Sequence, residues 1–149
     1  MSSHPHAPNC IFCKIVRGEV PSAPVLETDD AVAFLDIHPV NKGHVLLVPK
    51  AHHADLTELP EALAAACAKL LPRLCRAIKS ATGADGFNVI VNNGRAAGQV
   101  VPHSHWHIIP RSYNDPVDWT WPHSEYVGDE LGQMRFRIER ELNPPGTGD

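Results

Sequence analysis

Three histidines alternate with other residues and run directly into an apolar Ile-Ile-Pro sequence: His103, His105, His107, then Ile108, Ile109 and Pro110. Because successive side chains of a strand point to opposite faces, a strand over residues 101–110 would place all three imidazoles on one face. Imidazole titrates near neutral pH and can serve as acid, base, nucleophile or metal ligand. An affinity tag would lie at a terminus and lack the apolar residues. The row therefore predicts a strand that carries a chemical site.

Length and composition are those of an ordinary globular protein. The 149 residues fit one domain with a real core, and 43% hydrophobic with 20% charged residues argues against disorder. The net charge of −4 argues against a broad electrostatic surface for nucleic acid, so an anionic ligand would have to be bound by local donors. We expect a single domain over residues 1–149, with loose tails at 1–8 and 143–149.

The chain carries no sign of a membrane or secretory segment. Residues 1–8 lack a basic start and an apolar run, and no segment approaches the roughly 20 apolar residues of a membrane span. We therefore expect a cytoplasmic protein with no membrane partner, in which the four cysteines stay reduced. Cys67 and Cys75 lie in an Ala/Leu-rich helical pattern and are interpreted as small core residues.

Hydrophobic periodicity and turn signals predict an α+β fold with a five-stranded antiparallel sheet. A short N-terminal helix over residues 10–18 ends at Gly18, and one long helix is predicted over 60–80, where Pro72 should kink or split it. A C-terminal helix is expected over 129–142. The predicted strands are 25–27, 31–37, 44–49, 87–92 and 101–110.

Two further segments are less specific. The loop of residues 93–99 is rich in amide donors and glycines, which let backbone N–H groups approach a phosphate, but an ordinary hairpin loop explains it equally well. Residues 112–126 are irregular, and Trp119 and Trp121 there could shape a second binding site or cover a neighbouring subunit.

Three motifs together resemble the histidine triad (HIT) superfamily of nucleotide hydrolases and transferases. The first is the histidine row with Gly98-Gln99 before it and Ile108-Ile109 at its end. The other two are the segment from Gly43 to His52 and the segment from Phe34 to Ile37. They follow the order of that family and cover residues 10–111. Within the superfamily the chain most resembles the bacterial zinc-binding branch related to nucleoside phosphoramidases.

The resemblance implies a reaction. His105 would attack the α-phosphorus of a purine nucleotide, and water would hydrolyse the resulting nucleotidyl-imidazole, cleaving nucleoside phosphoramidates or dinucleoside polyphosphates. Neutral imidazole suits this task because it approaches an anionic phosphate without adding negative charge. His107, Asn92 and Gln99 would hold the phosphate oxygens, and His44 would orient the triad. A homodimer is also implied.

The resemblance also implies a nucleoside pocket. Asp36 would accept both ribose hydroxyls, as a two-oxygen carboxylate can. An apolar slot for the base would be formed by Ile11, Phe12, Ile15, Phe34 and Ile37. Taken alone, each of these five apolar residues is equally well explained as part of the core.

Cys10 and Cys13 have zinc-knuckle spacing, but a structural zinc site needs four nitrogen or sulfur ligands. The resemblance suggests His52 and His103 as the other two, which would give His103 a structural role. His53 is a rival ligand. A reduced redox pair is the rival interpretation, and it lacks a thioredoxin-like βαβ context.

Alternatives remain open. The three histidines could be catalytic metal ligands, although this leaves Asp36 and Gly98-Gln99 unexplained. The chain could be a non-catalytic nucleotide-binding or scaffold protein, or a nucleotidyl transferase. The transferase branch has glutamine at the third triad position, so His107 favours hydrolysis.

The chain departs from the family pattern at two positions. Ser104 is polar where the pattern prefers an apolar residue, which predicts a less buried back of the strand. Val100 stands where many relatives carry a serine or threonine able to donate toward the leaving group, which bears on phosphoramidate preference.

Overall fold

The computed structural model describes residues 6–146 and divides into two compact units, the first ending at Val117 and the second beginning at Asp118. The units are described separately. The outermost parts of the two predicted tails, residues 1–5 and 147–149, lie outside the described residues.

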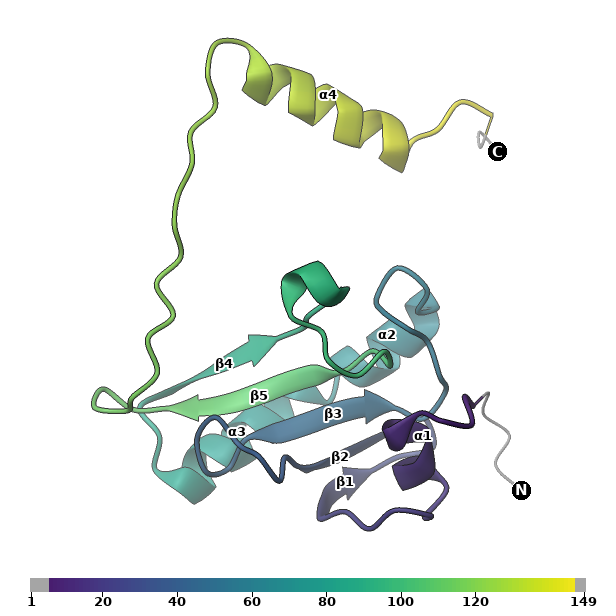
Figure 1. Ribbon diagram of the computed structural model, residues 1–149, viewed down its shortest axis with the longest axis vertical. Helices are drawn as coiled ribbons and strands as arrows, with labels where there is room; N and C mark the ends of the chain where they lie inside the picture. The colour runs from purple at the N-terminus through teal and green to yellow at the C-terminus, as the bar shows by residue number, and fades with distance from the viewer. Residues whose placement is uncertain (1–5, 147–149) are drawn as a thin grey trace. The chain divides into compact units, whose positions relative to one another are not determined.

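The first unit is built on one five-stranded antiparallel sheet, which confirms the predicted α+β class (Figure 1). Its strand order is β1-β2-β3-β5-β4, so that β3 and β5, which carry or adjoin the site residues, are neighbours at the centre. The strands are β1 (Pro24–Glu27), β2 (Ala31–Leu35), β3 (Val45–Pro49), β4 (Gly86–Ile90) and β5 (Trp106–Arg111).

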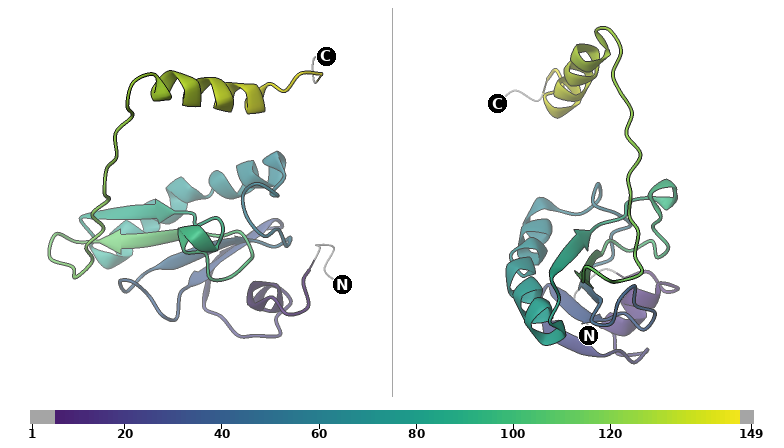
Figure 2. Two further views of the ribbon diagram at one scale, coloured as in Figure 1. Left: turned by 45° about the horizontal axis from the view of Figure 1, so that its top comes forward. Right: turned by 90° about the vertical axis from the view of Figure 1, so that its left-hand side faces the viewer.

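Both faces of the sheet are covered. Helices α2 (Glu61–Ala68) and α3 (Leu71–Thr82) lie on one face and the short helix α1 (Ile11–Val16) on the other (Figure 2). Alternate side chains of β2 and β3 point to opposite faces of the sheet. Ala33 and Leu47 pack on the face covered by α2 and α3. Phe34 and Leu46 pack with α1. Burial on both faces explains why these strands read as continuous apolar runs.

The predicted helix over residues 60–80 is split in two, as the proline inside it indicated. α2 ends at Ala68, and Pro72 lies in the first turn of α3, where its missing N–H has no helical acceptor to lose. α3 ends at Gly83, whose φ of +66° is the left-handed conformation typical of a helix end.

The strand that carries the histidines is shorter than predicted. β5 begins at Trp106, so His103 and His105 precede the strand and the single-strand prediction is wrong for these two residues. The ladder with β3 stops at the Leu47–Trp106 pair. Beyond it Pro49 has no N–H to donate, and the N–H of Ser104 donates instead to the carbonyl of His53 at 2.7 Å.

Gly43 lies just before β3, where the chain closely approaches the end of α3. Its φ is +100°, and a Cβ placed there would lie 2.5 Å from Thr82 Cγ2 and 3.3 Å from Pro110 Cγ. We expect Gly43→Ala to lower the free energy of unfolding by about 3 kcal/mol, through backbone strain and the clash together.

Gly83→Ala is the matched control, because Gly83 also has a positive φ but open space around its Cα. Gly83→Ala should lower the free energy of unfolding by only about 1 kcal/mol, the cost of placing a side chain in the left-handed conformation. Urea unfolding of both variants measures the difference. Equal losses would mean that the close approach to α3 contributes nothing.

The second unit contains helix α4 (Glu130–Leu142), close to the predicted 129–142. None of its thirteen residues is buried, and its apolar side chains, Leu131 and Ile138 among them, are exposed. Among the described residues no helix is long and apolar enough to cross a membrane.

Candidate active site and metal centre

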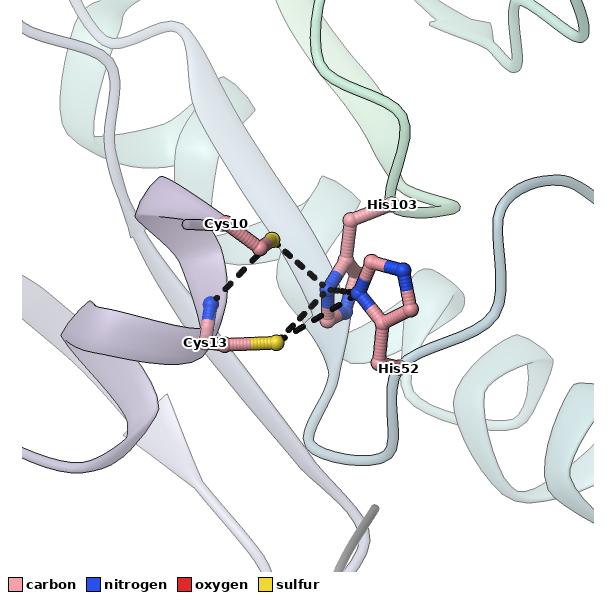
Figure 3. A group of neighbouring side chains, drawn as sticks. All are labelled: Cys10, Cys13, His52 and His103. Carbon is pink, nitrogen blue, oxygen red and sulfur yellow. Dashed lines mark hydrogen bonds between the residues drawn. The ribbon is translucent and has the colours of Figure 1, made fainter. Parts of the chain in front are cut away.

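Four side chains from three parts of the first unit converge beside α1 (Figure 3): Cys10, Cys13, His52 and His103. The Nε2 atom of His103 lies 2.8 Å from the carbonyl oxygen of Pro49, so that Nε2–H donates and Nδ1 presents a lone pair. This Nδ1 lies 3.4 Å from Cys10 Sγ and 3.6 Å from Cys13 Sγ. The structure thus brings together the four ligands named from the sequence.

The donor geometry fits a tetrahedral metal ion. Zinc–ligand distances of about 2.0 Å for nitrogen and 2.3 Å for sulfur place two nitrogens roughly 3.4 Å apart and a nitrogen and a sulfur about 3.6 Å apart. His52 Nδ1 lies 3.2 Å from His103 Nδ1 and 3.4 Å from Cys13 Sγ. A cation between the four side chains would take a lone pair from each of the two Nδ1 atoms and from each sulfur.

His105 is held in one tautomer. Its Nδ1 lies 2.7 Å from the carbonyl oxygen of His103, so Nδ1–H donates to that oxygen and Nε2 carries the lone pair. The side chain is buried at 5% exposure, and the ring packs edge-on against Phe12 at a centroid distance of 5.0 Å. A fixed ring with an unprotonated Nε2 is the arrangement that a nucleophilic imidazole requires.

A second chain of hydrogen bonds fixes His107. The backbone N–H of Val40 donates to His44 Nδ1 at 3.1 Å, which leaves the hydrogen of neutral His44 on Nε2. His44 Nε2 lies 2.9 Å from His107 Nδ1, so His44 donates and His107 keeps its own hydrogen on Nε2. His107 is thereby a donor, and its ring lies beside that of His105 at a centroid distance of 4.8 Å.

Burial keeps these imidazoles neutral. Desolvation is the largest cause that lowers the pKa of His44 and of His105, and it lowers the pKa of His107 to about 4 with the help of the neighbouring His105 and His44. Neutrality at pH 7 is what the two hydrogen-bond chains assume, so geometry and electrostatics agree.

The depressed pKa of His107 makes stability depend on pH. An unfolded histidine takes up a proton near pH 6.5, whereas native His107 resists it down to about pH 4. The unfolded state therefore binds more protons between these values, and stability falls as the pH drops through them. The side chain of His107→Gln cannot titrate. Between pH 7 and pH 5 we therefore expect its free energy of unfolding to fall by about 2 kcal/mol less than that of the wild type.

Urea unfolding at both pH values measures this difference. The metal ligands are the same in both proteins, so their contribution cancels. Parallel losses in the two proteins would show that His107 does not stay neutral in the native state.

A glycine-containing loop borders a cavity of about 600 Å³ in this unit. Its lining includes Gly94, Arg95 and Gly98 from the loop and Ala54 and Asp55 from the segment opposite. The side chain of Gln99 ties these two segments together, because its Nε2 donates to Ala54 at 2.7 Å and its Oε1 accepts from Gly94 N–H at 2.7 Å.

The HIT domain family matches residues 17–114, which is more than half of the chain. The chain belongs to the HIT domain family. Among similar proteins, "Adenylylsulfatase HINT3" of Arabidopsis thaliana is 48% identical over 138 residues, covering 90% of this chain and 70% of that protein. "Adenosine 5'-monophosphoramidase hnt1" of Schizosaccharomyces pombe is 46% identical over 135 residues, covering 90% and 98%.

Solved structures of HIT proteins share the fold. A Streptococcus mutans crystal structure superimposes with a TM-score of 0.89 at 39% identity, covering 96% of this chain and 91% of that one. A zinc-bound histidine triad family protein from Mycobacterium smegmatis has a TM-score of 0.71 at 34% identity, covering 91% and 96%.

The HIT residues predicted to hold the nucleoside lie on the α1 side of the sheet or at strand ends. Asp36 follows β2, and its Oδ1 accepts the N–H of His38 at 2.9 Å while its Oδ2 lies 3.8 Å from His44 Nδ1. Of the apolar set, Phe12 and Phe34 are buried, Ile15 is half-buried, and Ile11 and Ile37 are exposed at 41% and 81%. Exposed isoleucines beside buried aromatic rings are compatible with an open slot, and the base-binding role of the set stays a prediction.

The side chains predicted to contact phosphate differ in how they are placed and in whether their polar groups are already hydrogen-bonded within the protein. Asn92 lies just after β4 and is half-buried. Gln99 uses its acceptor and both amide hydrogens within the protein, because Nε2 also donates to the carbonyl of Val101 at 2.9 Å. In this conformation Gln99 shapes the loop, and its contact with phosphate stays a prediction.

The three triad histidines do not form one metal-ligating group among the described residues. His103 Nδ1 faces the cysteines, whereas His105 Nδ1 is bonded to a carbonyl. A second possible group, Asp36, His44 and His107, has its nitrogens engaged in the hydrogen-bond chain from Val40. The geometry therefore favours separate tasks over a catalytic metal held by the triad.

Two backbone groups that fix the imidazoles of this site could not be predicted from the sequence. The carbonyl of Pro49 sets the tautomer of His103, and the N–H of Val40 sets that of His44. Neither has a side-chain signature. The proline before the Lys50-Ala51-His52 segment was the only available hint, since it marks where the β3 ladder must end.

Ser104 is 1% exposed, so the expectation that the back of the strand is less buried there is wrong. The backbone N–H of Ser104 donates to the carbonyl of His53, and Ser104 Oγ has no hydrogen-bond partner among the residues the structure describes. An unpaired buried hydroxyl is unfavourable.

We expect Ser104→Ala to raise the free energy of unfolding by up to about 1 kcal/mol, measured by urea unfolding. A loss of stability would point to a partner for the hydroxyl.

Proposed function

We propose that this protein hydrolyses purine nucleotides at the α-phosphate through a covalent nucleotidyl-histidine on His105. The observation that carries the proposal is the pair of fixed tautomers: Nε2 of His105 has a free lone pair, and Nε2 of the adjacent His107 has a hydrogen. One ring can attack phosphorus while the other donates to a non-bridging oxygen.

In the first step, His105 Nε2 forms a bond to phosphorus, and the leaving group departs with the electron pair of its own bond. The adduct carries a positive charge on the imidazolium, which the hydrogen bond from Nδ1 to the carbonyl of His103 stabilises. In the second step, water attacks phosphorus and releases a proton to solvent, the P–N bond breaks, and its electron pair returns to Nε2 so that His105 leaves as neutral imidazole. Burial favours this neutral form, since it lowers the pKa of His105.

Substrate recognition is proposed for the remaining predicted residues. Asp36 would accept the ribose hydroxyls, the apolar set would flank the base, and Asn92 with loop amides would assist His107 at the phosphate. The names of the two relatives, an adenylylsulfatase and an adenosine 5'-monophosphoramidase, favour an adenine nucleotide with a small leaving group as the substrate.

We further propose that Cys10, Cys13, His52 and His103 hold a structural zinc ion. The support is the donor chemistry, the near-tetrahedral spacing and the zinc-bound relative. With four protein ligands the ion has no open position, so its contribution is to hold α1 against the segment that precedes β5. Two free thiols at such a site suit a reducing compartment, which supports a cytoplasmic location.

A homodimer is proposed as well. β4 is an edge strand of the sheet and exposes Phe87 and Val89 at 42% and 39%, apolar area that a second copy would cover. Light scattering of the purified protein gives the mass directly, and a monomer at micromolar concentration would exclude this assembly.

The function is tested by an activity panel on metal-loaded protein. The substrates are adenosine phosphoramidate, a lysyl-AMP adduct, adenylyl sulfate, diadenosine polyphosphates and UDP-glucose. We expect AMP release from at least one adenine nucleotide, and acid-quenched samples should show a nucleotide on the peptide that contains His105.

Other outcomes identify the alternatives. Nucleotide binding without turnover of any substrate would indicate a non-catalytic binding protein. Transfer of UMP from UDP-glucose to an acceptor would indicate a transferase. An adduct on a histidine other than His105 would overturn the assigned nucleophile.

A further inference from the structure

Phe12 lies between the two cysteines of the metal group in the sequence and touches the proposed nucleophile in space. Its ring centroid is 5.0 Å from that of His105 at an interplanar angle of 80°, and 5.8 Å from that of His103 at 79°. Phe12 is only 6% exposed, and its remaining ring contact is with Phe34. Its faces and edges are thus occupied by the protein, which leaves little surface for a base.

A second connection runs through the backbone of His103. The imidazole of this residue belongs to the metal group, and its carbonyl oxygen accepts the Nδ1–H of His105 at 2.7 Å. The orientation of His105 therefore depends on the metal group from two sides, through an aromatic contact and through a hydrogen bond.

We propose that Phe12 is a positioning residue for His105, and that occupancy of the Cys10/Cys13/His52/His103 group holds Phe12 and the His103 carbonyl in the arrangement that fixes the His105 ring. This inference rests on the proposed function for the identity of the nucleophile. It assigns to the metal group an effect on the rate of chemistry in addition to its effect on stability.

Local energetics support this coupling. α1 has six residues, too few for a helix to be stable on its own, so its position depends on what its ends are attached to. Without a cation, only hydrogen bonds to sulfur of 3.4–3.6 Å join Cys10 and Cys13 to the imidazoles of His52 and His103. The group then relaxes, Phe12 shifts with α1, and the His105 ring gains rotational freedom.

Kinetics separate this positioning role from the base-binding role predicted for Phe12. A residue that stacks on the base contributes to binding, so its truncation raises KM. A residue that holds the nucleophile contributes to reaching the transition state, so its truncation lowers kcat. For Phe12→Leu we expect kcat to fall about 10-fold or more with KM within about 2-fold, since small misplacements of a reacting group are costly.

The closing experiment adds a readout that does not require turnover. Nitrogen-15 NMR of histidine-labelled protein distinguishes a ring held as a single Nδ1–H tautomer from a mixture. We expect the single tautomer of His105 in the metal-loaded wild type, and a mixture both in Phe12→Leu and in wild type stripped by a chelator at 25 °C. Leu74→Ala is the control, because Leu74 packs on the opposite face of the sheet and its truncation destabilises the protein without touching His105.

The outcomes are distinct. A raised KM with unchanged kcat in Phe12→Leu, or a single His105 tautomer in both the variant and the stripped protein, would overturn the inference. A mixture of tautomers in Leu74→Ala as well would do so too, since general loosening would then explain the effect. If the metal-loaded wild type turns over no substrate, the proposed function fails while the NMR result still decides whether Phe12 positions His105. If Phe12→Leu does not fold, the stripped wild type carries the test.

Discussion

Replacement of His105 by alanine is expected to lower kcat for hydrolysis of the preferred nucleotide by roughly 10⁴-fold or more, because the covalent route is lost with the nucleophile. No other imidazole in the site can take over. His107 has its hydrogen on Nε2 and its lone pair bonded to His44, and His103 Nδ1 faces the two cysteines. AMP release under saturating substrate measures the loss.

The matched control is His123→Ala, which removes an exposed imidazole from the second unit and should leave kcat within about 2-fold. Both variants should keep the metal, because neither residue belongs to the ligand group. A second variant, His105→Gly, leaves space in which free imidazole can act as the nucleophile, so added imidazole should restore part of the rate. An alanine variant that is folded, metal-loaded and still within 10-fold of wild type would remove His105 from the mechanism.

Much of the fold follows from local sequence signals. The hydrophobic pattern predicted the strands at β2 and β3, and Pro72 predicted the division between α2 and α3. These predictions are confirmed because each depends on a property of the residues themselves. A proline lacks its N–H in any context, and an alternating or continuous apolar pattern needs burial wherever the strand lies.

The start of β5 could not be predicted in the same way. The alternation of histidines suggests a strand from residue 101, but pairing requires a partner strand with donors, and β3 ends at Pro49. The prediction failed because the pairing of this segment depends on β3, which lies far from residue 101 in the sequence. The burial of Ser104 was mispredicted for a related reason, since burial depends on how the folded chain packs and not on the polarity of the side chain alone.

The candidate site shows the same division between residue types and their environment. The ligand set and the triad were predictable as residue types, and the structure brings Cys10, Cys13, His52 and His103 together. The functional state of each imidazole was not predictable, because it is set by a backbone carbonyl or N–H. Phe12 illustrates the limit: from the sequence it is one of five apolar residues for a base, and only the ring contacts show that it packs on His105.

Loss of the metal group is the second change with a large expected effect, and Cys13→Ala tests it. Cys13 and Cys67 are both 0% exposed, so Cys67→Ala is a control matched in residue type and burial. Cys67 lies in α2, packs in the core on the other face of the sheet, and belongs to no possible metal-ligating group among the described residues. The two variants lose the same thiol volume and differ in whether a metal ligand is removed.

Binding of an ion by the native state alone stabilises it, and the energy is large for structural zinc. We expect Cys13→Ala to lower Tm by about 10 °C more than Cys67→Ala, which corresponds to roughly 4 kcal/mol for a chain of this size. A strong chelator should lower the Tm of the wild type and of Cys67→Ala but leave that of Cys13→Ala unchanged. Equal shifts in the two variants, with no zinc detected by elemental analysis of the wild type, would mean that the four side chains meet as a hydrogen-bonded cluster.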